Sequence, residues 1–567
     1  MNIIKQIGIL DFIHRETQGI TTKLFILTAS AGVANALNLA IINNAVSSIA
    51  QNGPKWSDFV LFALSLTLFV YSLRYILYES TQLAEQAIAS VRTRLANKVR
   101  KLDLQSLEAI GAADIHSRIS RDTTAISQAA RPLFACAQGI VMILVTLIYI
   151  GAVSPVAMAA CLLLIAAGGG YYLQKRATYE EGLQTSSDTE DRLYNDLDNL
   201  LKGFKEIRLN QPKSEDVYAE FRDAATKVRR VRGRVMLLFS DNIVFVEMFF
   251  MLLLGMIVFV LPNFSDSVAQ DATKIVAAIL FFFQPLGNVT MAIPMFSAVN
   301  ITVDNLKRLE NEMDEVLKQQ PKEDTQQVAD LSDFSQITLN DFGFAYHDHS
   351  GKERFHVGPF NTHLNRGEIV FLVGGNGSGK TTFMKLLTHL YHPTEGNLYV
   401  DDLKIDTDNV QSLRNMFSCI FTDFHLFDKL YGLSTIAPDR VNDLLKVMQI
   451  DHKTDYLNGA WQTTDLSTGQ RKRLAMVTAY MEDKPIYIFD EVAADQDPQF
   501  RKYFYETLLQ DLKKQGKTII VVSHDDHYFH VGDRVWQMDY GSLSELKTPP
   551  KPRPRTRSRT KQKEGKS

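Results

Sequence analysis

Six long apolar runs in the first 300 residues constrain the fold of this 567-residue chain more than any other feature. About 20 mostly apolar helical residues cross a bilayer core, and each run is long enough to do so. The runs lie at 21–50, 57–80, 133–152, 153–173, 236–261 and 273–299. A soluble helical core could explain one such run, but six at this spacing are hard to explain in that way. The sequence therefore predicts an all-α membrane domain over residues 1–310.

Basic residues gather in two of the connections between these runs. The segments 81–131 and 174–235 are rich in Lys and Arg, whereas the opposite connections, 51–58 and 262–272, contain only Lys55. Positive charge stays on the cytoplasmic side of a membrane, so both long loops and both termini are predicted to be cytoplasmic. The long loops also have helical character, and we expect the spanning helices to continue into the cytoplasm.

Two ionisable residues, Asp241 and Glu247, lie within the fifth apolar run. Such groups usually face the interior of a helix bundle or water. A structural hydrogen bond between helices, or a side chain that reaches the interface, explains each of them equally well. We expect Glu247 to face a translocation cavity and to influence which substrates enter it.

A glycine-rich loop follows a short apolar strand in the second half of the chain. The strand EIVFLV (368–373) runs into GGNGSGKTT (374–382), and the helix-forming segment FMKLL follows. This strand–loop–helix context matches the phosphate-binding pattern G-x-x-x-x-G-K-[ST]. Lys380 would reach the β- and γ-phosphates of ATP, and the Thr381 hydroxyl would bind Mg²⁺. The residues predicted to contact ATP are Gly374, Gly375, Asn376, Gly377, Ser378, Gly379, Lys380, Thr381 and Thr382.

Two further apolar strands end in polar residues. PIYIFDE (485–491) places Asp490 and Glu491 at its carboxyl end, and TIIVVSH (518–524) ends in His524. Open α/β folds bind their ligands at this end of parallel strands. We expect Asp490 to hold Mg²⁺, Glu491 to polarise the attacking water and His524 to contact the γ-phosphate. Either feature alone is common without function, but the upstream phosphate loop favours the functional interpretation.

The segment LSTGQRKRLA (466–475) places polar turn residues ahead of a helix-forming stretch, as an ordinary helix N-terminus does. However, four motifs follow one another along the chain in the order GGNGSGKTT, LSTGQRKRLA, IYIFDE and His524. This order resembles the nucleotide-binding domain of ABC transporters. The six apolar runs with two long cytoplasmic loops resemble the exporter-type transmembrane domain of the same family. The resemblance covers about residues 20 to 545.

This resemblance implies an α/β P-loop ATPase (ABC ATPase) domain over 336–546. The polar, charged residues 311–335 predict a linker between this domain and the membrane domain. The resemblance also implies that ATP hydrolysis is coupled to export, with ATP and Mg²⁺ as cofactors. Tyr346, in FAYHD, would stack on adenine. One chain carries one domain of each kind, so a homodimer with two ATP sites across its interface is expected. In each site the signature residues of the other copy would contact the γ-phosphate; they are Ser467, Thr468, Gly469 and Gln470.

Two segments depart from the usual ABC pattern. Where many relatives have a glutamine, the stretch CIFTDFHLFDKL (419–430) places Thr422, followed by Asp423, and either is a candidate Mg²⁺ ligand. The loop after Glu491 reads VAADQD (492–497) instead of ATSALD. The combination of FTDFHLFD, LSTGQRKRLA and DEVAADQDP resembles one branch in particular, the cyclic-peptide and siderophore-peptide exporters of the syringomycin and pyoverdine type. GFKEIRLN (203–210), in the second cytoplasmic loop, also resembles that branch.

The favoured function is therefore export of a peptide-like or amphipathic molecule across a bacterial cytoplasmic (inner) membrane. A lipid or multidrug flippase is the nearest alternative. A soluble ABC-type ATPase acting on nucleic acid, or a regulatory membrane ATPase, fits the apolar runs and the intact catalytic positions less well. Residues 547–567, with nine Lys or Arg and one acid, predict a disordered tail. Such a tail could simply keep the chain soluble, or it could be attracted to anionic lipid headgroups; nucleic-acid binding is the least favoured interpretation.

Overall fold

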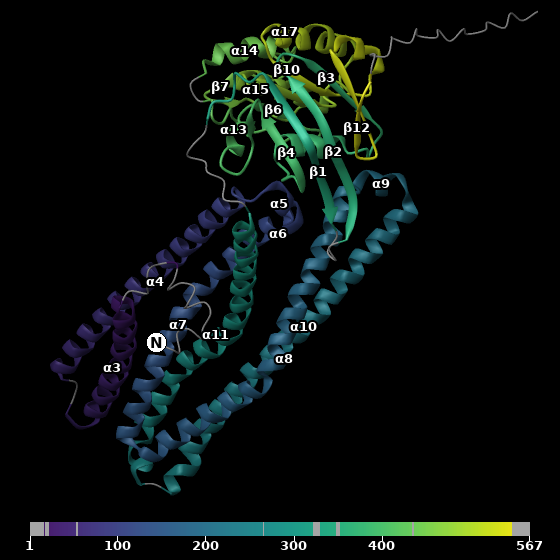
Figure 1. Ribbon diagram of the computed structural model, residues 1–567. Helices are drawn as coiled ribbons and strands as arrows, with labels where there is room; N and C mark the ends of the chain where they lie inside the picture. The colour runs from purple at the N-terminus through teal and green to yellow at the C-terminus, as the bar shows by residue number, and fades with distance from the viewer. Residues whose placement is uncertain are drawn as a thin grey trace, which may run out of the picture. The chain divides into compact units, whose positions relative to one another are not determined.

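The computed structural model describes Glu16 and residues 22–52, 55–264, 266–320, 329–347, 352–433 and 436–546. These residues form two units (Figure 1). The first contains the chain up to Leu102 and Ile110–Leu317, and the second contains Asp103–Ala109 and the residues from Lys318 onward. The expected basic tail at 547–567 lies outside the described residues.

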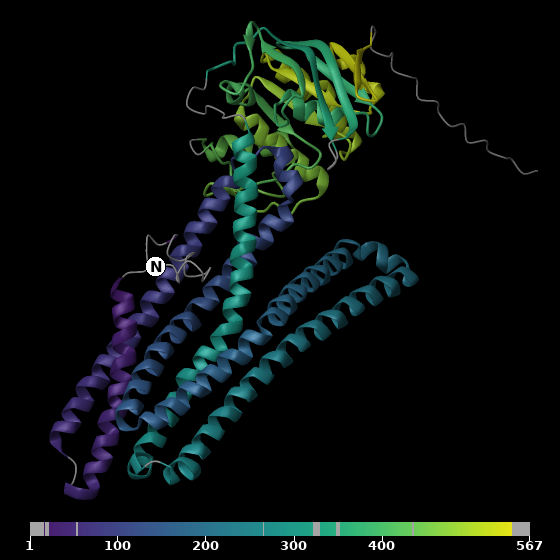
Figure 2. The same cartoon turned by 60° about the horizontal axis from the view of Figure 1, so that its bottom comes forward.

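Six helices of the first unit, within the described ranges, are long and apolar enough to cross a membrane. They are α3 (Thr22–Asn52), α4 (Trp56–Val99), α7 (Thr123–Val153), α8 (Pro155–Lys202), α10 (Gln211–Gly255) and α11 (Asp266–Gln319). The predicted six-helix membrane domain is confirmed. Several helices extend well beyond the apolar runs, so the expected spans are shorter than the helices that contain them. Figure 2 shows α8 and α10 as a long pair joined by the short helix α9 (Phe204–Leu209).

The tight turn between α7 and α8 follows directly from its sequence. Ser154 has extended backbone angles, which ends α7, and its side-chain oxygen accepts a hydrogen bond from the Ala157 N–H at 3.4 Å. Pro155 occupies the first position of α8, where a missing N–H removes no helical hydrogen bond.

The remaining short elements between residues 104 and 263 are α5 (Leu104–Ile110), α6 (Ala112–Ser117), π-helical turns at Arg118–Asp122 and Met256–Val260, and a 3₁₀ turn at Leu261–Asn263.

The polar sequence after residue 310 begins as a helix, not as the linker expected over 311–335. Helix α11 continues through Gln319, because buried apolar residues such as Leu309 and Met313 extend its packed face. Charged residues on α11 also pair with α4: Arg94 with Glu310 at 2.7 Å, and Lys98 with Asp314 at 2.6 Å. Residues 321–328 lie outside the described ranges.

The segment Asp103–Ala109 belongs with the second unit, although the sequence placed it inside the membrane domain at 1–310. Leu104 of α5 packs against a hydrophobic cluster of the second unit. Glu108 accepts hydrogen bonds from Lys385 Nζ at 2.9 Å and from the Tyr391 hydroxyl at 2.5 Å. These partners are almost 300 residues away in the chain, so hydropathy alone could not assign the segment.

The second unit contains two main sheets. The antiparallel sheet has the order β2-β1-β4-β5, and the larger sheet has the order β12-β11-β3-β10-β9-β6, parallel except for β12. The strands are β1 (Gln336–His347), β2 (Glu353–Asn365), β3 (Ile369–Gly374), β4 (Glu395–Val400), β5 (Leu403–Lys404), β6 (Phe417–Ile420), β9 (Ile486–Asp490), β10 (Thr518–Val522), β11 (Arg534–Asp539) and β12 (Ser542–Glu545), with a small hairpin of β7 (Tyr456–Leu457) and β8 (Ala460–Trp461). This architecture confirms the predicted α/β ATPase domain.

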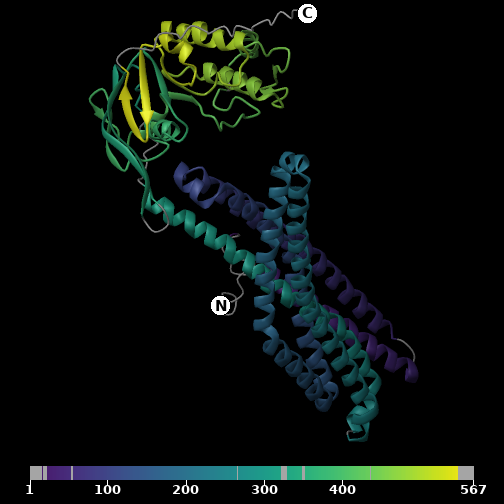
Figure 3. The ribbon, with the colours of Figure 1, turned by 90° about the vertical axis from the view of Figure 1, so that its right-hand side faces the viewer.

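Helices cover the face of the larger sheet that is turned away from the antiparallel sheet (Figure 3). Ile369 and Phe371 of β3 point into the cluster beneath these helices, whereas Val370 and Leu372 point into the cluster between the sheets. Burial on both faces explains the uninterrupted apolar run EIVFLV. The helices of this unit are α12 (Lys380–Leu387), α13 (Val410–Arg414), α14 (Pro438–Val447), α15 (Thr468–Glu482), α16 (Pro498–Tyr503), a π-helical turn Phe504–Leu508, α17 (Leu509–Lys514) and a 3₁₀ turn Asp526–Val531.

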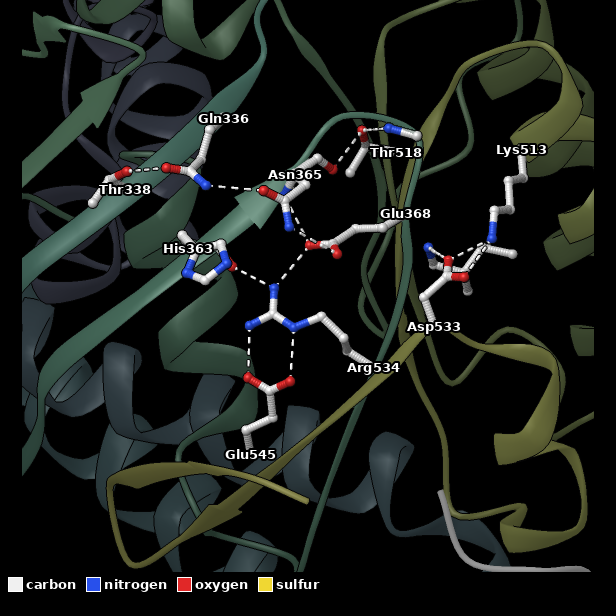
Figure 4. A network of polar contacts seen from close by, with 12 residues as sticks. Gln336, Thr338, His363, Asn365, Glu368, Lys513, Thr518, Asp533, Arg534 and Glu545 are labelled. Atoms are coloured by element: carbon white, nitrogen blue, oxygen red, sulfur yellow. Dashed lines mark hydrogen bonds and ion pairs between the residues drawn. The ribbon is translucent and has the colours of Figure 1, made fainter. Parts of the chain in front are cut away.

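A polar network fixes the starting end of β3 (Figure 4). The Arg534 guanidinium donates to Glu368 at 2.9 Å and to both carboxylate oxygens of Glu545 at 2.7 and 2.9 Å. Glu368 in turn accepts from the Asn365 N–H, and Asp533 accepts from the Ile369 N–H. Because β3 leads directly into the phosphate loop, this network anchors the strand that positions the loop.

Candidate ATP-binding site

Four adjacent parallel strands bring the predicted functional residues to one edge of the larger sheet. The order β3-β10-β9-β6 places the 374–382 loop, His524, Asp490 and Thr422 after successive strands. Residues more than 140 positions apart in the chain therefore meet at the carboxyl ends of the strands, where a parallel α/β sheet binds its ligand.

The phosphate loop needs glycine at particular positions. Gly377 and Gly379 have φ angles of +74° and +107°, which side chains with a Cβ rarely adopt. A Cβ on Gly374 would collide with the Met538 carbonyl oxygen on the neighbouring strand β11. The glycines thus allow the loop to turn tightly beside β11 and to present its backbone to a ligand.

Two side chains of the loop are prepared for an anion. The Ser378 Oγ is buried and has no hydrogen-bond partner among the described residues. The buried Lys380 ammonium donates to the carbonyl oxygens of Gly374 and Gly375, both at 3.0 Å. A phosphate would supply the acceptor that Ser378 lacks and the negative charge that balances Lys380. The donor set therefore fits a nucleotide phosphate.

Asp490 is buried at the end of β9, and Thr422, one of the two candidate Mg²⁺ ligands of the 419–430 stretch, hydrogen-bonds to it. The Thr422 N–H and hydroxyl donate to the Asp490 carboxylate at 3.4 and 3.3 Å. Burial raises the pKa of Asp490, and the hydrogen bonds from Thr422 act in the opposite direction. A buried carboxylate beside a hydroxyl suits a hard cation such as Mg²⁺.

Glu491 and His524 contact each other across neighbouring strands. The His524 Nε2 lies 3.2 Å from the Glu491 Oε1. Glu491 has a φ of +51°, an uncommon value for a residue with a Cβ, and its N–H donates to the Val522 carbonyl at 3.2 Å. The turn after β9 therefore directs the carboxylate toward the residue that follows β10.

Tyr346 lies beside the end of the phosphate loop. Its hydroxyl is 3.1 Å from the Thr382 hydroxyl, and its ring packs edge-on against Phe344 with the ring centroids 4.9 Å apart. The ring is only partly buried. This position next to the loop is compatible with a nucleotide base stacking on the ring.

The predicted signature residues form the N-terminus of α15. Ser467 caps this helix through a reciprocal pair of hydrogen bonds with Gln470, a capping box. Ser467 and Thr468 are exposed, so their side chains and the helix N-terminus are accessible to an anion. The ordinary helix-cap interpretation is therefore correct as structure, and it leaves the end of the helix open to a ligand.

Sequence reasoning missed four residues that connect α15 to the loop after Glu491. Lys472 and Arg473 lie two and three residues after the signature, and they contact Asp495, Gln496 and other parts of that loop. The loop 492–497 carried a signal, because it departs from the expected family pattern by gaining charged or polar residues. Without a structure, nothing paired this loop with α15.

In the membrane unit, helices α8, α10 and α11 line an apolar cavity of about 170 Å³. Its lining is Leu164, Ile165, Gly168, Gly169, Tyr172, Asn242, Phe245, Val246, Phe249, Leu286, Val289 and Thr290. Glu247 is exposed and does not line this cavity, because one residue along a helix turns the side chain by about 100° from Val246. The polar residue of α10 that does line it is Asn242.

Comparison with known proteins agrees with these observations. The family model described as ABC transporter transmembrane region matches residues 21–289, and the one described as ABC transporter matches residues 357–494. The chain belongs to the ABC transporter family. It is thus a multi-pass membrane protein of the exporter type, with an ATPase coupled to transport.

Individual relatives of this ABC transporter differ in how much of the chain they match. The ATP-binding protein SyrD of Pseudomonas syringae pv. syringae is 28% identical over 91% of this chain and 92% of its own length. A lipid A-core flippase of Bordetella avium (33% identical) and the subtilin transport protein SpaT of Bacillus subtilis (28%) match about a third of each chain. A bacterial Atm1-family ABC exporter with ATP bound has the same fold, with a TM-score of 0.67, 20% identity and coverage of 92% and 93% of the two chains.

Proposed function

We propose that this ABC transporter exports a peptide-like, amphipathic molecule, and that it works as a homodimer in a bacterial cytoplasmic membrane. The observation that carries the substrate class is the cavity between α8, α10 and α11. Its wall is largely apolar and aromatic, with Tyr172, Asn242 and Thr290 as polar groups. An apolar wall with few hydrogen-bonding groups suits a molecule that has both apolar surface and amide groups.

Similarity along the whole chain supports the same choice. SyrD matches both domains, whereas the lipid A-core flippase matches only about a third of the chain. The motifs FTDFHLFD, DEVAADQDP and GFKEIRLN resemble those of the peptide-exporting branch, and this resemblance also favours a peptide-like substrate. Lipid flipping remains the second candidate, because an apolar cavity in a membrane unit also suits an acyl chain.

We assign the ATP-site residues from their positions at the sheet edge. Lys380 and the loop 374–382 would bind the phosphates, and Tyr346 would stack on adenine. Thr381 and Asp490 would hold Mg²⁺, with Thr422 steadying Asp490; the metal would neutralise charge on the phosphates. Glu491 would orient the attacking water and accept its proton. His524, in contact with Glu491, would donate to the γ-phosphate.

The signature residues 467–470 support the homodimer proposal. They form the N-terminus of α15, whereas the loop 374–382 follows β3. The proposal is that each ATP lies between the phosphate loop of one copy and α15 of the other. Nucleotide binding would then hold the two ATPase domains together, and hydrolysis would let them separate.

The test uses the purified full-length chain in lipid nanodiscs, with ATP hydrolysis measured while candidate molecules are added. We expect a cyclic amphipathic peptide to raise the rate and lipid A to leave it unchanged. The Glu491→Gln variant, which should retain bound ATP without turnover, controls for contaminating ATPases. Stimulation by lipid A alone would favour the flippase and contradict the peptide proposal.

Two variants of α10 locate the substrate site in the same assay. Asn242→Leu removes a polar group from the cavity wall, and Glu247→Gln changes a charge outside it. If this cavity binds the substrate, Asn242→Leu weakens the peptide response and Glu247→Gln does not. The reverse result would support the sequence-based expectation that Glu247 lines the pathway.

A further inference from the structure

Lys472 is a buried lysine within the helix that carries the signature residues. Its side chain is only 6% exposed, although it lies just five residues after Ser467. An ammonium group in such a position needs partners to offset the loss of water. Lys472 Nζ has two: the backbone carbonyl oxygen of Glu491 at 2.7 Å and the Asp495 carboxylate at 2.7 Å.

The first of these partners belongs to the residue assigned to orient the attacking water. The Glu491 backbone has the left-handed φ of +51°, a conformation that persists only where the surroundings hold it. The Val522 carbonyl accepts from the Glu491 N–H, and Lys472 donates to the Glu491 carbonyl. The peptide groups on both sides of the Glu491 Cα are therefore fixed, and this sets the direction of the carboxylate toward His524.

The rest of the loop is also tied to α15. The Gln496 side chain donates to the Gly469 carbonyl at 2.9 Å and accepts from Arg473 Nε at 2.8 Å. Arg473 also forms an ion pair with Asp497. Three consecutive residues of the loop, 495–497, thus contact the signature helix, and two of the helix residues involved are basic.

We propose that Lys472 is a positioning residue for hydrolysis, which holds the Glu491 backbone so that its carboxylate stays beside His524. Lys472 lies on the helix whose N-terminus would serve the ATP bound by the other copy. A shift of that helix on engaging nucleotide is therefore passed to the Glu491 of its own subunit, which links the two ATP sites. This inference rests on the role of Glu491 proposed above.

The decisive variant is Lys472→Met in the full-length chain, compared with Lys472→Arg, Lys472→Gln and Asp495→Asn. We expect Lys472→Met to lower kcat by about 10-fold or more, with KM for ATP within about twofold of wild type, because the reacting groups lose alignment and the phosphate loop is unchanged. Lys472→Arg and Lys472→Gln, which retain an N–H donor, should recover part of the loss. Asp495→Asn leaves the contact with Glu491 in place, so its kcat should stay within about threefold of wild type.

Several outcomes would overturn the inference. They are a wild-type kcat in Lys472→Met, a KM raised as much as kcat is lowered, or an equal loss in Asp495→Asn. If Lys472→Met does not fold, Lys472→Ala, which also lacks the N–H donor, gives the same comparison against Asp495→Asn. Glu491→Gln separates the two proposals: if it hydrolyses ATP at the wild-type rate, the role of Glu491 is wrong, whereas an inactive Glu491→Gln with a fully active Lys472→Met refutes the positioning role alone.

Discussion

Individual buried polar residues in the ATPase unit depend on specific neighbours for their hydrogen bonds. Lys380 and Lys472 are buried with carbonyl partners, and Asp490 is buried with hydrogen bonds from Thr422. His389 is the contrasting case, because its Nδ1 has no partner among the described residues. Burial lowers the pKa of His389 to about 3 from its ordinary value of 6.5, so the ring is neutral at physiological pH.

His389 should make the ATPase unit less stable in mild acid. Below pH 6.5 the unfolded chain binds a proton at this ring, but the folded chain does not until about pH 3. Stability is therefore unaffected above pH 6.5 and falls as pH drops from 6.5 toward 3, by up to about 1.4 kcal/mol per pH unit. We expect His389→Asn, which tolerates the φ of +54° at this position, to reduce that loss.

The measurement is the melting temperature of the full-length chain in nanodiscs at pH 7.5 and pH 5.5. Wild type should lose more between the two values than His389→Asn, and both proteins should show similar ATPase activity at pH 7.5. An equal loss in the two proteins would show that His389 is not the group responsible.

At the level of elements, the N-terminus of α15 combines a local and a long-range task. Ser467 and Gln470 satisfy the first backbone groups through their own side chains, while residues farther along the helix hold the loop after β9. In α11, by contrast, pairs such as Lys98 with Asp314 support a charged helical end that polarity alone marked as a linker. In α11 and in the part of α15 beyond its cap, the polar residues are held by hydrogen bonds and ion pairs with another element.

Replacing Ser467 by arginine separates the two tasks of α15. We expect Ser467→Arg to bind ATP normally and to lose hydrolysis by about 100-fold, because a bulky cation blocks the helix N-terminus. Ser467→Ala, the matched control, loses only the cap, worth about 1 kcal/mol of stability, and should keep more activity. Nucleotide affinity and single-turnover hydrolysis are the readouts; loss of ATP binding in Ser467→Arg would place Ser467 in the site of its own subunit.

For the whole molecule, the central prediction is that each ATP site uses two copies of the chain. The described residues of one chain contain one phosphate loop and one signature helix, so a site composed across an interface requires a second copy. Mixed dimers of differently tagged chains test this arrangement directly.

In one mixed dimer, Lys380→Ala lies on one chain and Ser467→Arg on the other; in the second, both changes lie on one chain beside a wild-type partner. Composite sites predict one intact site in the first dimer and none in the second. Vanadate-dependent trapping of labelled nucleotide counts the intact sites. Trapping in the second dimer and not in the first would show that each chain forms its own site.

Local patterns in the sequence were enough to determine the two kinds of domain and the core of the ATP site. Six apolar runs specify membrane helices, and a strand followed by GGNGSGKTT specifies a phosphate loop, because hydropathy and backbone geometry act over short stretches. The placement of Asp490, Glu491 and His524 at the ends of strands was likewise predictable. It required only that the strands be parallel neighbours.

Tertiary structure alone decided which side chains meet. It placed Thr422, not Asp423, on Asp490, turned Glu247 away from the cavity that Asn242 lines, and joined Lys472 to the Glu491 carbonyl. These contacts connect separate elements, and they depend on the rotation of each helix and the order of strands in the sheet. A sequence specifies such contacts only through the packing of the whole domain, so composition and spacing could not reveal them in advance.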